Sequence, residues 1–360
     1  MEMARDITYF QSLLKTELDL TQRYINSFSN SKDKPANKSI EHIVNNKGKM
    51  LRPIFLTLCS KYSNLANKGK NGKEQYFLDD TAKAAAILEL IQMSSLVHDD
   101  VLDNSFSRRN KATLNSLRGN RFAVLMGDYL IAQSLKNCYQ LVYQAEHILD
   151  YDILYCFLDN ISKLVLGEVQ QNNLNENPDT NENEILCYYQ IVENKTASLF
   201  SLACYVGSKI GSYTSIFSES LKQFGHHIGV AYQIIDDLRD FAFTKEISGE
   251  HNFQDIKFGV KTLPIIFAEK YSTSGDKEKL NQIFNSKKDI SEKNKHEIIK
   301  ILQKSGSIQR CATEANLHFH IAKGILAELP ENEHSVLLVE LTDYLSSVGD
   351  SVMNDIKKIQ

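Results

Sequence analysis

The sequence predicts an all-α protein, built as a single bundle of long helices. Apolar residues recur at helical spacing through most of the chain, and the alternation typical of strands is hard to find. Only five prolines occur among the 360 residues, which leaves long intervals suited to long helices. The chain is 42% hydrophobic, enough for a sizeable core without a second domain. We therefore expect residues 1–360 to form one all-α domain.

Helices are expected one after another from the amino terminus. The first covers residues 1–28, where Ile7, Phe10 and Leu14 follow helical spacing. The second covers residues 39–46 and ends before Gly48, because glycine weakens a helix. The others are expected at residues 51–62, 79–103, 122–142, 148–171, 185–210 and 215–243, with more helices after Thr262.

Three polar stretches are expected to form exposed loops, near residues 64–75, 171–184 and 244–261. The first is rich in glycine and lysine, and the second in asparagine and acidic residues. The third is charged and follows an acidic motif. It is therefore close enough to that motif to act as a lid.

Charge and composition exclude several classes of function. The formal net charge is −4, which argues against a general nucleic-acid binder. No apolar run is long enough for a transmembrane segment, and Met1 is not followed by a basic and then apolar leader. The six cysteines are widely spaced and lie mostly in apolar stretches, as core residues do. We expect a soluble cytoplasmic protein.

The most informative stretch is residues 88–109, in which an apolar helical run ends in D-D-V-L-D and R-R follows. Asp99 and Asp103 are four residues apart, so on a helix they share a face, where like charges repel by roughly 0.2–0.5 kcal/mol. They also face the negative end of the helix dipole. A cation is therefore expected nearby. His98 abuts Asp99, and we favour a structural role for it over that of a base.

The same pattern recurs 137 positions later, counting from Asp99 to Asp236. There the motif Y-Q-I-I-D-D-L-R-D places Asp236, Asp237 and Asp240 at the end of another apolar helix. One such cluster is as often a solvated helix end as a binding site. The first cluster also contains Asp100. If both clusters face one cavity, their six carboxylates cannot all stay ionised without counter-charge. Magnesium is the usual answer, because it prefers oxygen ligands and is shared between one or two carboxylates and a substrate phosphate.

Several basic residues are candidate partners for a phosphate group. The motif G-K-M-L-R-P places Lys49 and Arg52 at a helix start, a natural anion site, although such residues are more often only solvated. Arg108 and Arg109 can form salt bridges with the first acidic motif or grip phosphate oxygens bidentately. Lys195 lies in an apolar helix, where a buried lysine requires an anionic partner.

In type, order and spacing, these motifs resemble those of the trans-isoprenyl diphosphate synthases, the polyprenyl synthetase family. The resemblance covers most of the chain and is densest over residues 48–264. Besides the motifs above, it rests on V-L-M-G-D-Y-L at 124–130, G-E-V-Q-Q at 167–171, K-T at 195–196 and T-L-P at 262–264. It implies the isoprenoid synthase type I fold, in which long helices surround a deep central cavity with both acidic motifs at its mouth. A homodimer is a further expectation from the family.

The resemblance also assigns the acidic residues. It implies three magnesium ions per active site, and the direct ligands would be Asp99, Asp103 and Asp236. The remaining aspartates of the two motifs would bond to metal-bound water or to neighbouring cations; they are Asp100, Asp237 and Asp240.

The two substrates implied by the resemblance are an allylic diphosphate and isopentenyl diphosphate. The first would be held with the help of Arg108, Lys195 and Lys261. The second would lie against Lys49, Arg52 and Arg109. Gln92 stands where many family members have histidine, and its amide can still donate to a diphosphate.

The implied reaction is prenyl transfer in all-trans chain elongation. The allylic C–O bond ionises in a pocket that excludes water, and the isopentenyl double bond attacks the cation. A proton is then lost, in the family view to the departing diphosphate, so no protein nucleophile is required. Thr196 and Gln233 resemble the family's polar groups that face the cation with their oxygen atoms.

Product length depends in this family on an aromatic residue four or five positions before the first acidic motif. Ser95 and Ser94 occupy these positions here. Their small side chains would leave the cavity open towards Ile91 and Leu88, so products longer than geranylgeranyl diphosphate are expected. Leu164 is one residue from another helix that could close the tunnel instead.

The expected lid departs from the family pattern. Glu250 stands where a diphosphate-binding lysine is common, Phe253 where glycine is common and Val260 where a second lysine often lies. Lys257 and Lys261 are candidates to replace them.

Three alternatives stay open beside long-chain elongation. They are a short-chain farnesyl or geranylgeranyl diphosphate synthase, a cyclising terpene synthase on the same fold, and a weakly active regulatory subunit of a two-component synthase. The lid departures motivate the last of these. The paired acidic motifs and G-K-M-L-R-P favour chain elongation.

Overall fold

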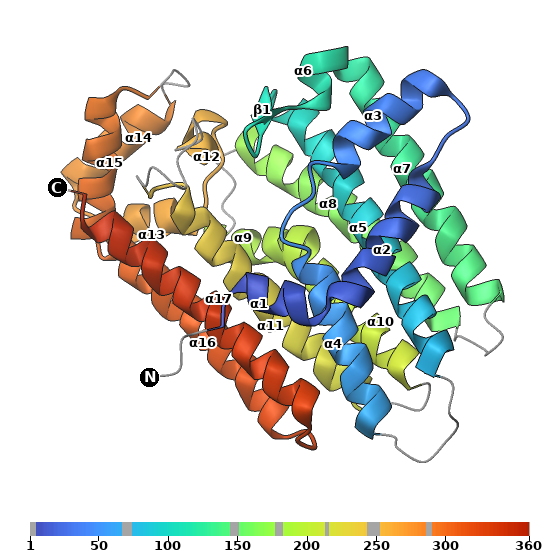
Figure 1. The fold of residues 1–360 in the computed structure, drawn as a ribbon. Helices are drawn as coiled ribbons and strands as arrows, with labels where there is room; N and C mark the ends of the chain where they lie inside the picture. Colours follow the sequence, from blue (N-terminus) through green and yellow to red (C-terminus); the bar gives the residue numbers. More distant parts are fainter. Residues whose placement is uncertain are drawn as a thin grey trace. The chain divides into compact units, whose positions relative to one another are not determined.

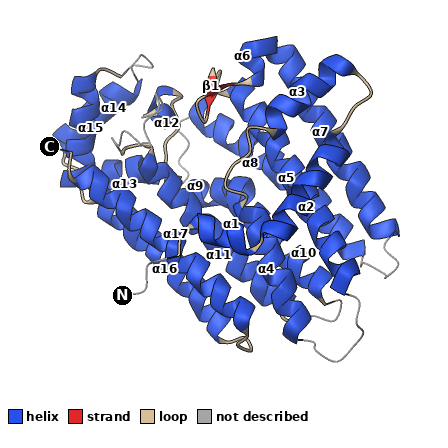
Figure 2. Ribbon diagram, in the orientation of Figure 1, coloured by secondary structure: helices blue, strands red, loops and turns tan. Residues whose placement is uncertain are grey.

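The computed structural model describes residues 5–66, 74–144, 151–176, 183–212, 216–242, 253–285 and 290–359. These residues are almost entirely helical (Figures 1 and 2), so the predicted all-α class agrees with the structure. Within them, the only strands are β1 (Ser107–Arg108) and β2 (Lys111–Ala112), which form one antiparallel hairpin. This hairpin was not expected from the sequence.

The chain divides into two compact units, neither of which is continuous in sequence. Unit 1 consists of Met1–Ser162, Ser198–Gly225 and Lys323–Leu341, and unit 2 of Lys163–Ala197, His226–Ala322 and Thr342–Gln360. The single domain over residues 1–360 therefore stays a prediction, and each unit is described by itself.

Unit 1 contains the helices of the amino-terminal half. They are α1 (Ile7–Leu13), α2 (Lys15–Ser29), α3 (Lys34–Val44), α4 (Leu51–Ala66), α5 (Glu74–Leu102), α6 (Leu114–Arg118), α7 (Asn120–Gln144) and α10 (Ser198–Gly211), with parts of helices shared with unit 2. One part of its core lies between α5 and α7, where Leu90, Met93 and Val97 are buried with Met126 and Leu130. This packing holds the first acidic motif at the carboxyl end of α5.

Unit 2 contains most of the carboxyl-terminal half. Its own elements are α9 (Glu184–Val192), the π-helix η1 (Glu193–Ala197), α12 (Gln254–Lys257), α13 (Leu263–Tyr271), α14 (Ser274–Asn285) and α15 (Glu292–Lys304). Four helices contribute residues to both units: α8 (Tyr151–Glu176), α11 (Ser218–Arg239), α16 (Ser307–Ala327) and α17 (Glu333–Lys357).

Several helix boundaries differ from those predicted. The helix expected over residues 1–28 is interrupted at Leu14, which separates α1 from α2. The helix α3 begins before the predicted residue 39, because Oδ1 of Asp33 accepts a hydrogen bond from the amide of Ala36 at 2.8 Å and caps it. Helices α4 and α8 run into two of the predicted loops, whose remaining residues, 67–73 and 177–182, lie outside the described residues.

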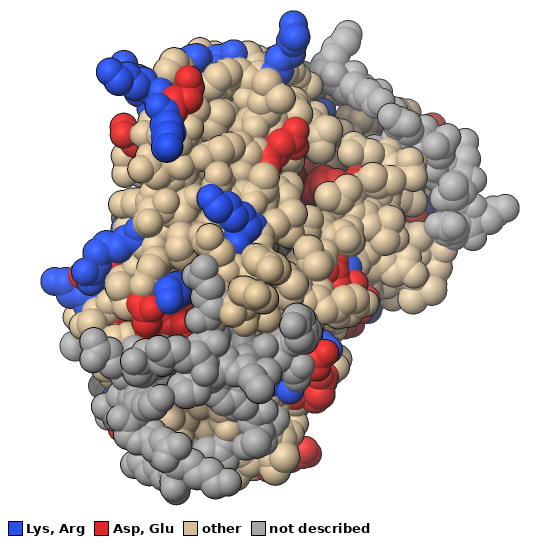
Figure 3. All heavy atoms as spheres, turned by 90° about the vertical axis from the view of Figure 1, so that its right-hand side faces the viewer, with Lys and Arg blue, Asp and Glu red and all other residues tan. Residues whose placement is uncertain are grey.

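The described helices include none with both the length and the apolar character needed to cross a membrane. Acidic and basic side chains are interspersed on the side of the molecule drawn in Figure 3, where neither sign forms a continuous patch.

Candidate functional site

The helix α5 ends at the first acidic motif in a left-handed turn. Asn104 has a φ of 47°, and the amide of Ser105 bonds to the carbonyl of Asp100 at 2.9 Å. This arrangement is a Schellman motif, in which a left-handed residue stops the helix. The amide of Asp103 still bonds to the carbonyl of Asp99 at 2.8 Å. Helical spacing therefore reaches Asp103, and both side chains remain half-buried on one face.

Asp100 points inward and pairs with Arg108. The Nε atom of Arg108 donates to Oδ1 of Asp100 at 2.8 Å, and the Asp100 carboxylate is buried. Burial raises the pKa of Asp100, while the charge and hydrogen bond of Arg108 oppose the rise. This contact agrees with the expectation that Asp100 bonds to a neighbouring cation. The predicted use of Arg108 on a substrate diphosphate stays a prediction.

Arg109 occupies the turn of the β1–β2 hairpin. Arg109 and Asn110 have φ values of 52° and 60°, as a type I′ turn requires. Nη1 of Arg109 donates to the carbonyl of Asn46 at 2.7 Å. A Cβ atom on Gly48 would lie 2.6 Å from Nη2 of Arg109, so any other residue would require the guanidinium to shift. The glycine of G-K-M-L-R-P thereby brings Arg109 next to the segment that carries Lys49.

A buried carboxylate lies within electrostatic reach of two predicted diphosphate ligands. Cζ of Arg52 stands 4.8 Å from the ring centroid of Phe200, a cation–π contact. Glu89 is 7% exposed; burial raises its pKa, and the charges of Arg52 and Arg109 oppose the rise. The Oε1 atom of Gln92 is also buried and has no hydrogen-bond partner among the described residues. Sequence reasoning missed Glu89, although a lone acid inside the apolar run L-E-L-I was a usable signal.

The two serines expected to govern product length differ in their surroundings. Ser94 is fully buried, and its Oγ donates to the carbonyl of Gly127 on α7 at 2.8 Å. Ser95 is half-buried, and its Oγ donates to the carbonyl of Gln92 at 3.0 Å. Ile91 is buried on the same helix. Ser94 is therefore part of the α5–α7 packing, and the length-determining roles of all three residues stay predictions.

His98 holds α5 against α7. Its Nε2 atom lies 3.2 Å from the carbonyl of Val124 and 3.4 Å from Oδ1 of Asp128. Both partners belong to the motif V-L-M-G-D-Y-L on α7. These contacts agree with the structural role expected for His98.

The helix predicted over residues 185–210 is present from Glu184 to Gly211, but a π-helical turn at Glu193–Ala197 interrupts its α-helical geometry. This wider turn carries Lys195 and Thr196, and π-helical turns are frequent at functional sites. The motif G-E-V-Q-Q on α8 lies against it. A Cβ atom on Gly167 would lie 2.6 Å from Cγ of Lys195, which explains the glycine.

Lys195 has the anionic partner that burial in an apolar helix requires. Its Nζ atom forms an ion pair with Glu168 and donates to Oε1 of Gln171 at 2.6 Å. The neighbouring Asn194 donates to Oε1 of Gln170 at 2.9 Å. The G-E-V-Q-Q motif therefore fixes the π-helix through polar contacts.

Thr196 and Gln233, the two residues expected to face the allylic cation, are in contact. Oγ1 of Thr196 donates to Oε1 of Gln233 at 2.6 Å, and Nε2 of Gln233 donates to Oδ1 of Asp237 at 2.8 Å. Oδ2 of Asp237 accepts from the hydroxyl of Tyr188 at 2.6 Å. Burial raises the pKa of Asp237 to about 7, despite these two donors. Sequence reasoning missed Tyr188.

The three aspartates of the second motif have different surroundings. The side chain of Asp236 is 48% exposed and pairs with Arg239 at 2.7 Å. Asp237 is buried. Asp240 accepts from the amides of Gln254 at 3.0 Å and Asp255 at 3.2 Å, so it connects the end of α11 to α12. Asp236 is the aspartate of this motif best placed to reach a metal.

The described part of the expected lid surrounds α12. Phe253 has a φ of 64° and is buried, and its ring meets that of Phe241 edge-on at 5.4 Å. A left-handed backbone explains why glycine suits this position. Nζ of Lys261 donates to Glu184 at 3.0 Å and to Glu269 at 2.8 Å, so two carboxylates already hold this candidate diphosphate ligand. Glu250 lies outside the described residues.

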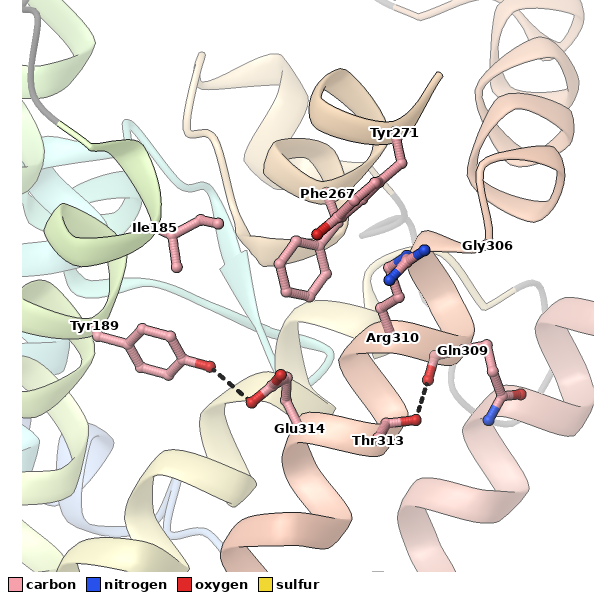
Figure 4. A pocket seen from close by; sticks show the side chains of 9 residues that line it. All are labelled: Ile185, Tyr189, Phe267, Tyr271, Gly306, Gln309, Arg310, Thr313 and Glu314. Carbon is pink, nitrogen blue, oxygen red and sulfur yellow. Dashed lines mark hydrogen bonds between the residues drawn. The ribbon is translucent and has the colours of Figure 1, made fainter. Parts of the chain in front are cut away.

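Unit 2 also contains an open groove of about 630 Å³ (Figure 4). Helices α9, α13 and α16 line it with Ile185, Tyr189, Phe267, Tyr271, Gly306, Gln309, Arg310, Thr313 and Glu314. The hydroxyl of Tyr189 donates to Oε2 of Glu314 at 3.4 Å, and Cζ of Arg310 stands 3.8 Å from the ring centroid of Tyr271. None of the residues predicted for the site lines this groove.

The candidate residues are divided between the two units, and those of each unit are called a group here. The group in unit 1 contains Asp99, Asp100, Asp103, Arg52, Glu89, Gln92, Arg108 and Arg109, with Lys49 close in sequence. The group in unit 2 contains Lys195, Thr196, Gln233, Asp236, Asp237, Asp240 and Tyr188, with Lys261 on the segment before α13. The convergence of the two groups on one cavity stays a prediction.

Known proteins are similar to this chain in sequence and in fold. The polyprenyl synthetase family model matches residues 33–302. The all-trans-nonaprenyl-diphosphate synthase (geranyl-diphosphate specific) of Rhodobacter capsulatus is 32% identical over 320 residues, covering 89% of this chain and 91% of that protein. The heptaprenyl diphosphate synthase component 2 of Geobacillus stearothermophilus is 28% identical over 334 residues, covering 93% and 96%.

A solved structure supports the same comparison. The crystal structure of a decaprenyl diphosphate synthase from Rhodobacter capsulatus aligns with a TM-score of 0.80 and 25% identity, covering 98% of this chain and 99% of that one. This similarity confirms the all-α fold class that the sequence predicts.

Proposed function

Because the chain belongs to the polyprenyl synthetase family, we propose that it condenses isopentenyl diphosphate with an allylic diphosphate in all-trans chain elongation. The observation that carries the proposal is the presence of both complete acidic motifs, within residues 33–302 that match the family model, each at the end of a buried helix. Relatives of similar length are named nonaprenyl and heptaprenyl diphosphate synthases.

Magnesium is the proposed cofactor, with three ions per active site. The donor set fits it: Asp99 and Asp103 are half-buried and Asp236 is exposed, whereas Asp100 and Asp237 are buried. Hard oxygen ligands are what magnesium prefers. When bound, it supplies positive charge that offsets the developing charge of the leaving diphosphate.

The protein's own residues have separate proposed roles around the two substrates. Arg52 and Arg109, with Lys49 and the amide of Gln92, bind the diphosphate of isopentenyl diphosphate. Their cluster suits this role, because an arginine fork binds phosphate oxygens bidentately.

The diphosphate of the allylic substrate is proposed to meet three other basic residues. Lys195, with Arg108 and Lys261, binds its diphosphate, and a substrate would have to compete with the carboxylates that hold these cations in the structure. Thr196 and Gln233 face the allylic cation with oxygen atoms. The proton lost after coupling passes to the departing diphosphate.

A product longer than geranylgeranyl diphosphate is proposed. Ser94 and Ser95 leave the positions before the first acidic motif without an aromatic side chain. Two relatives described above carry the names nonaprenyl and heptaprenyl, which denote chains longer than geranylgeranyl. The cytoplasm is the proposed location, since the highly charged diphosphate substrates are water-soluble.

A homodimer is proposed as the assembly. The described part of α7 exposes Leu125, Tyr139 and Tyr143, and the two tyrosine rings stack at 5.3 Å. On α8, Tyr155 and Leu158 are exposed at helical spacing. Apolar faces of this kind are typical of surfaces that a second chain covers. Sedimentation of the purified protein would measure the assembly.

A second candidate function is one component of a two-component synthase. The similarity to a heptaprenyl diphosphate synthase component 2 over 93% of the chain favours it. The departures from the family pattern in the lid are also consistent with a need for a partner. A protein that binds an allylic primer with magnesium but does not elongate it alone would favour this candidate.

The experiment that tests the proposal is an elongation assay. Purified protein is incubated with magnesium, isopentenyl diphosphate and farnesyl diphosphate, and the products are sized by chromatography. We expect products beyond geranylgeranyl diphosphate, abolished by a chelator and reduced at least about 100-fold in Asp236→Asn. The exposed Asp19 provides the control variant Asp19→Asn, which should keep full activity. Products that stop at geranylgeranyl diphosphate would identify a short-chain synthase, and no incorporation with any primer would reject the proposal.

A further inference from the structure

The hydroxyl of Tyr188 begins a chain of hydrogen bonds that reaches the residues proposed to face the allylic cation. It donates to Oδ2 of Asp237 at 2.6 Å. Nε2 of Gln233 donates to Oδ1 of the same carboxylate at 2.8 Å, and Oγ1 of Thr196 donates to Oε1 of Gln233 at 2.6 Å. All four residues belong to unit 2. The chain is therefore complete within one compact unit.

Each bond in this chain has a defined direction while Asp237 is ionised. A carboxylate only accepts hydrogen bonds, so Tyr188 and Gln233 both donate to it. The amide of Gln233 therefore turns its nitrogen towards Asp237 and its oxygen towards Thr196. The Gln233 oxygen keeps a second lone pair, and the Thr196 hydroxyl oxygen keeps its own. An amide turned the other way would present hydrogens, which repel a cation.

Burial makes the contribution of Tyr188 hard to replace. Tyr188 is 6% exposed and Asp237 is 4% exposed, so little water can reach the carboxylate if the hydroxyl is removed. Hydrogen bonds in such a buried network also strengthen one another.

We propose that Tyr188 is a positioning residue for prenyl transfer: its hydroxyl fixes the Asp237 carboxylate, so that Gln233 and Thr196 present oxygen atoms to the allylic cation. The inference rests on the proposed prenyltransferase function and adds to it a buried residue that acts through its neighbours. The π-helix η1 has a part in this arrangement, because it places Thr196 against Gln233.

The adjacent tyrosine supplies a matched control. Tyr189 follows on the same helix, α9, but its hydroxyl donates to Glu314 in the open groove (Figure 4). Both tyrosines lose one hydroxyl on substitution by phenylalanine. Only one of these hydroxyls belongs to the chain that ends at Thr196.

The first measurement compares Tyr188→Phe and Tyr189→Phe in the full-length protein with magnesium, isopentenyl diphosphate and a farnesyl primer. We expect kcat of Y188F to fall about tenfold, the effect of one ordinary hydrogen bond on a barrier. KM for both substrates should change little, whereas the melting temperature should fall, because the buried Asp237 carboxylate loses a donor. Y189F should keep the wild-type kcat. An unchanged kcat in Y188F, or an equal loss in Y189F, overturns the inference.

The second measurement is a double-mutant cycle with Gln233→Leu. If Tyr188 acts through Gln233, Y188F has little further effect once the amide is gone, so the double variant resembles Q233L. A packing defect unrelated to Gln233 would instead multiply the two losses, and that outcome overturns the inference.

Two safeguards keep the test decisive. An active wild type with an unchanged Y188F rejects only the role of Tyr188, whereas a wild type that incorporates no isopentenyl diphosphate rejects the proposed function and this inference together. If Y188F does not fold, as judged by circular dichroism, Asp237→Asn takes its place in the cycle. An asparagine at position 237 can donate to Gln233, which would turn the Gln233 amide round. We therefore expect the same non-additive loss of kcat in the cycle with D237N. Multiplied losses in that cycle would also overturn the inference.

Discussion

The guanidinium of Arg108 lies 2.8 Å from the buried carboxylate of Asp100, so the β1–β2 hairpin is fastened to the first acidic motif by an ion pair. The contact leaves Asp99 and Asp103, the other aspartates of the motif, on the partly exposed face of the helix end. The hairpin thus separates the three carboxylates into one that is buried in an ion pair and two that are half-buried at the helix end.

Arg108→Ala should destabilise unit 1, because it leaves the Asp100 carboxylate buried without its partner. We expect a loss of about 2 kcal/mol in the free energy of unfolding, less than for a fully buried pair because Arg108 is 30% exposed. Chemical denaturation would measure it. Lys111→Ala in the same hairpin is the control, since Nζ of Lys111 bonds to the Asn45 carbonyl in an exposed position and its loss should cost under about 0.5 kcal/mol. Equal effects of the two variants would contradict the prediction.

The two serines before the first acidic motif should respond differently to enlargement. Ser94→Phe places a large ring in the α5–α7 interface and removes the bond to the Gly127 carbonyl, so it should cost at least about 1–3 kcal/mol of stability. Ser95→Phe should fold normally and shorten the product, because Ser95 is only half-buried. Melting temperature and product sizing in parallel test this pair. A stable S95F with an unchanged product would mean that other residues set the length.

Gly167→Ala should displace Lys195. The added methyl carbon would stand 2.6 Å from Cγ of Lys195, so the π-helix or the lysine must shift, at a cost of about 1–3 kcal/mol and with lower activity. Gly324→Ala is the matched control, since nothing lies within 4 Å of its added carbon, and it should stabilise the exposed helix by up to about 1 kcal/mol. Thermal unfolding and initial rates measure both variants. An active, fully stable G167A would show that η1 tolerates the contact.

Glu89 should make stability depend on pH. Burial raises its pKa above the ordinary 4.5, so the folded state holds the proton where the unfolded state has released it. Stability from this group is therefore present below pH 4.5 and is lost as pH rises through the raised folded pKa. Glu89→Gln should remove that slope, which urea titrations at several pH values would reveal. The exposed Glu328 gives the control Glu328→Gln, and identical slopes in wild type and E89Q would contradict the prediction.

Much of the fold and of the site could be predicted from the sequence. Helical spacing of apolar residues identifies α5 and α11, and the aspartates that end them are visible as motifs. The family resemblance drawn from these motifs is confirmed by the match to the family model. The anionic partner expected for Lys195 also exists, in Glu168.

The features that were missed depend on contacts between distant residues. The hairpin turns at Arg109 and Asn110, which carry no glycine signal, and the bond from Arg109 to Asn46 accompanies its left-handed backbone. The π-helix looks like ordinary helix in sequence, and the contact between Gly167 and Lys195 appears only once α8 and η1 meet. In the sequence, Tyr188 resembles any other aromatic residue of the core, and only the structure shows that its hydroxyl donates to Asp237.

Because Asp240 accepts hydrogen bonds from the backbone amides of Gln254 and Asp255, these two amides report the position of its carboxylate. While the carboxylate stays in place, those two amide protons are shielded from solvent deuterium. A carboxylate recruited by an incoming cation would release both of them at once. Hydrogen-exchange rates at these two positions, measured with and without magnesium and a diphosphate, would therefore distinguish an aspartate that stays with the backbone from one that leaves it.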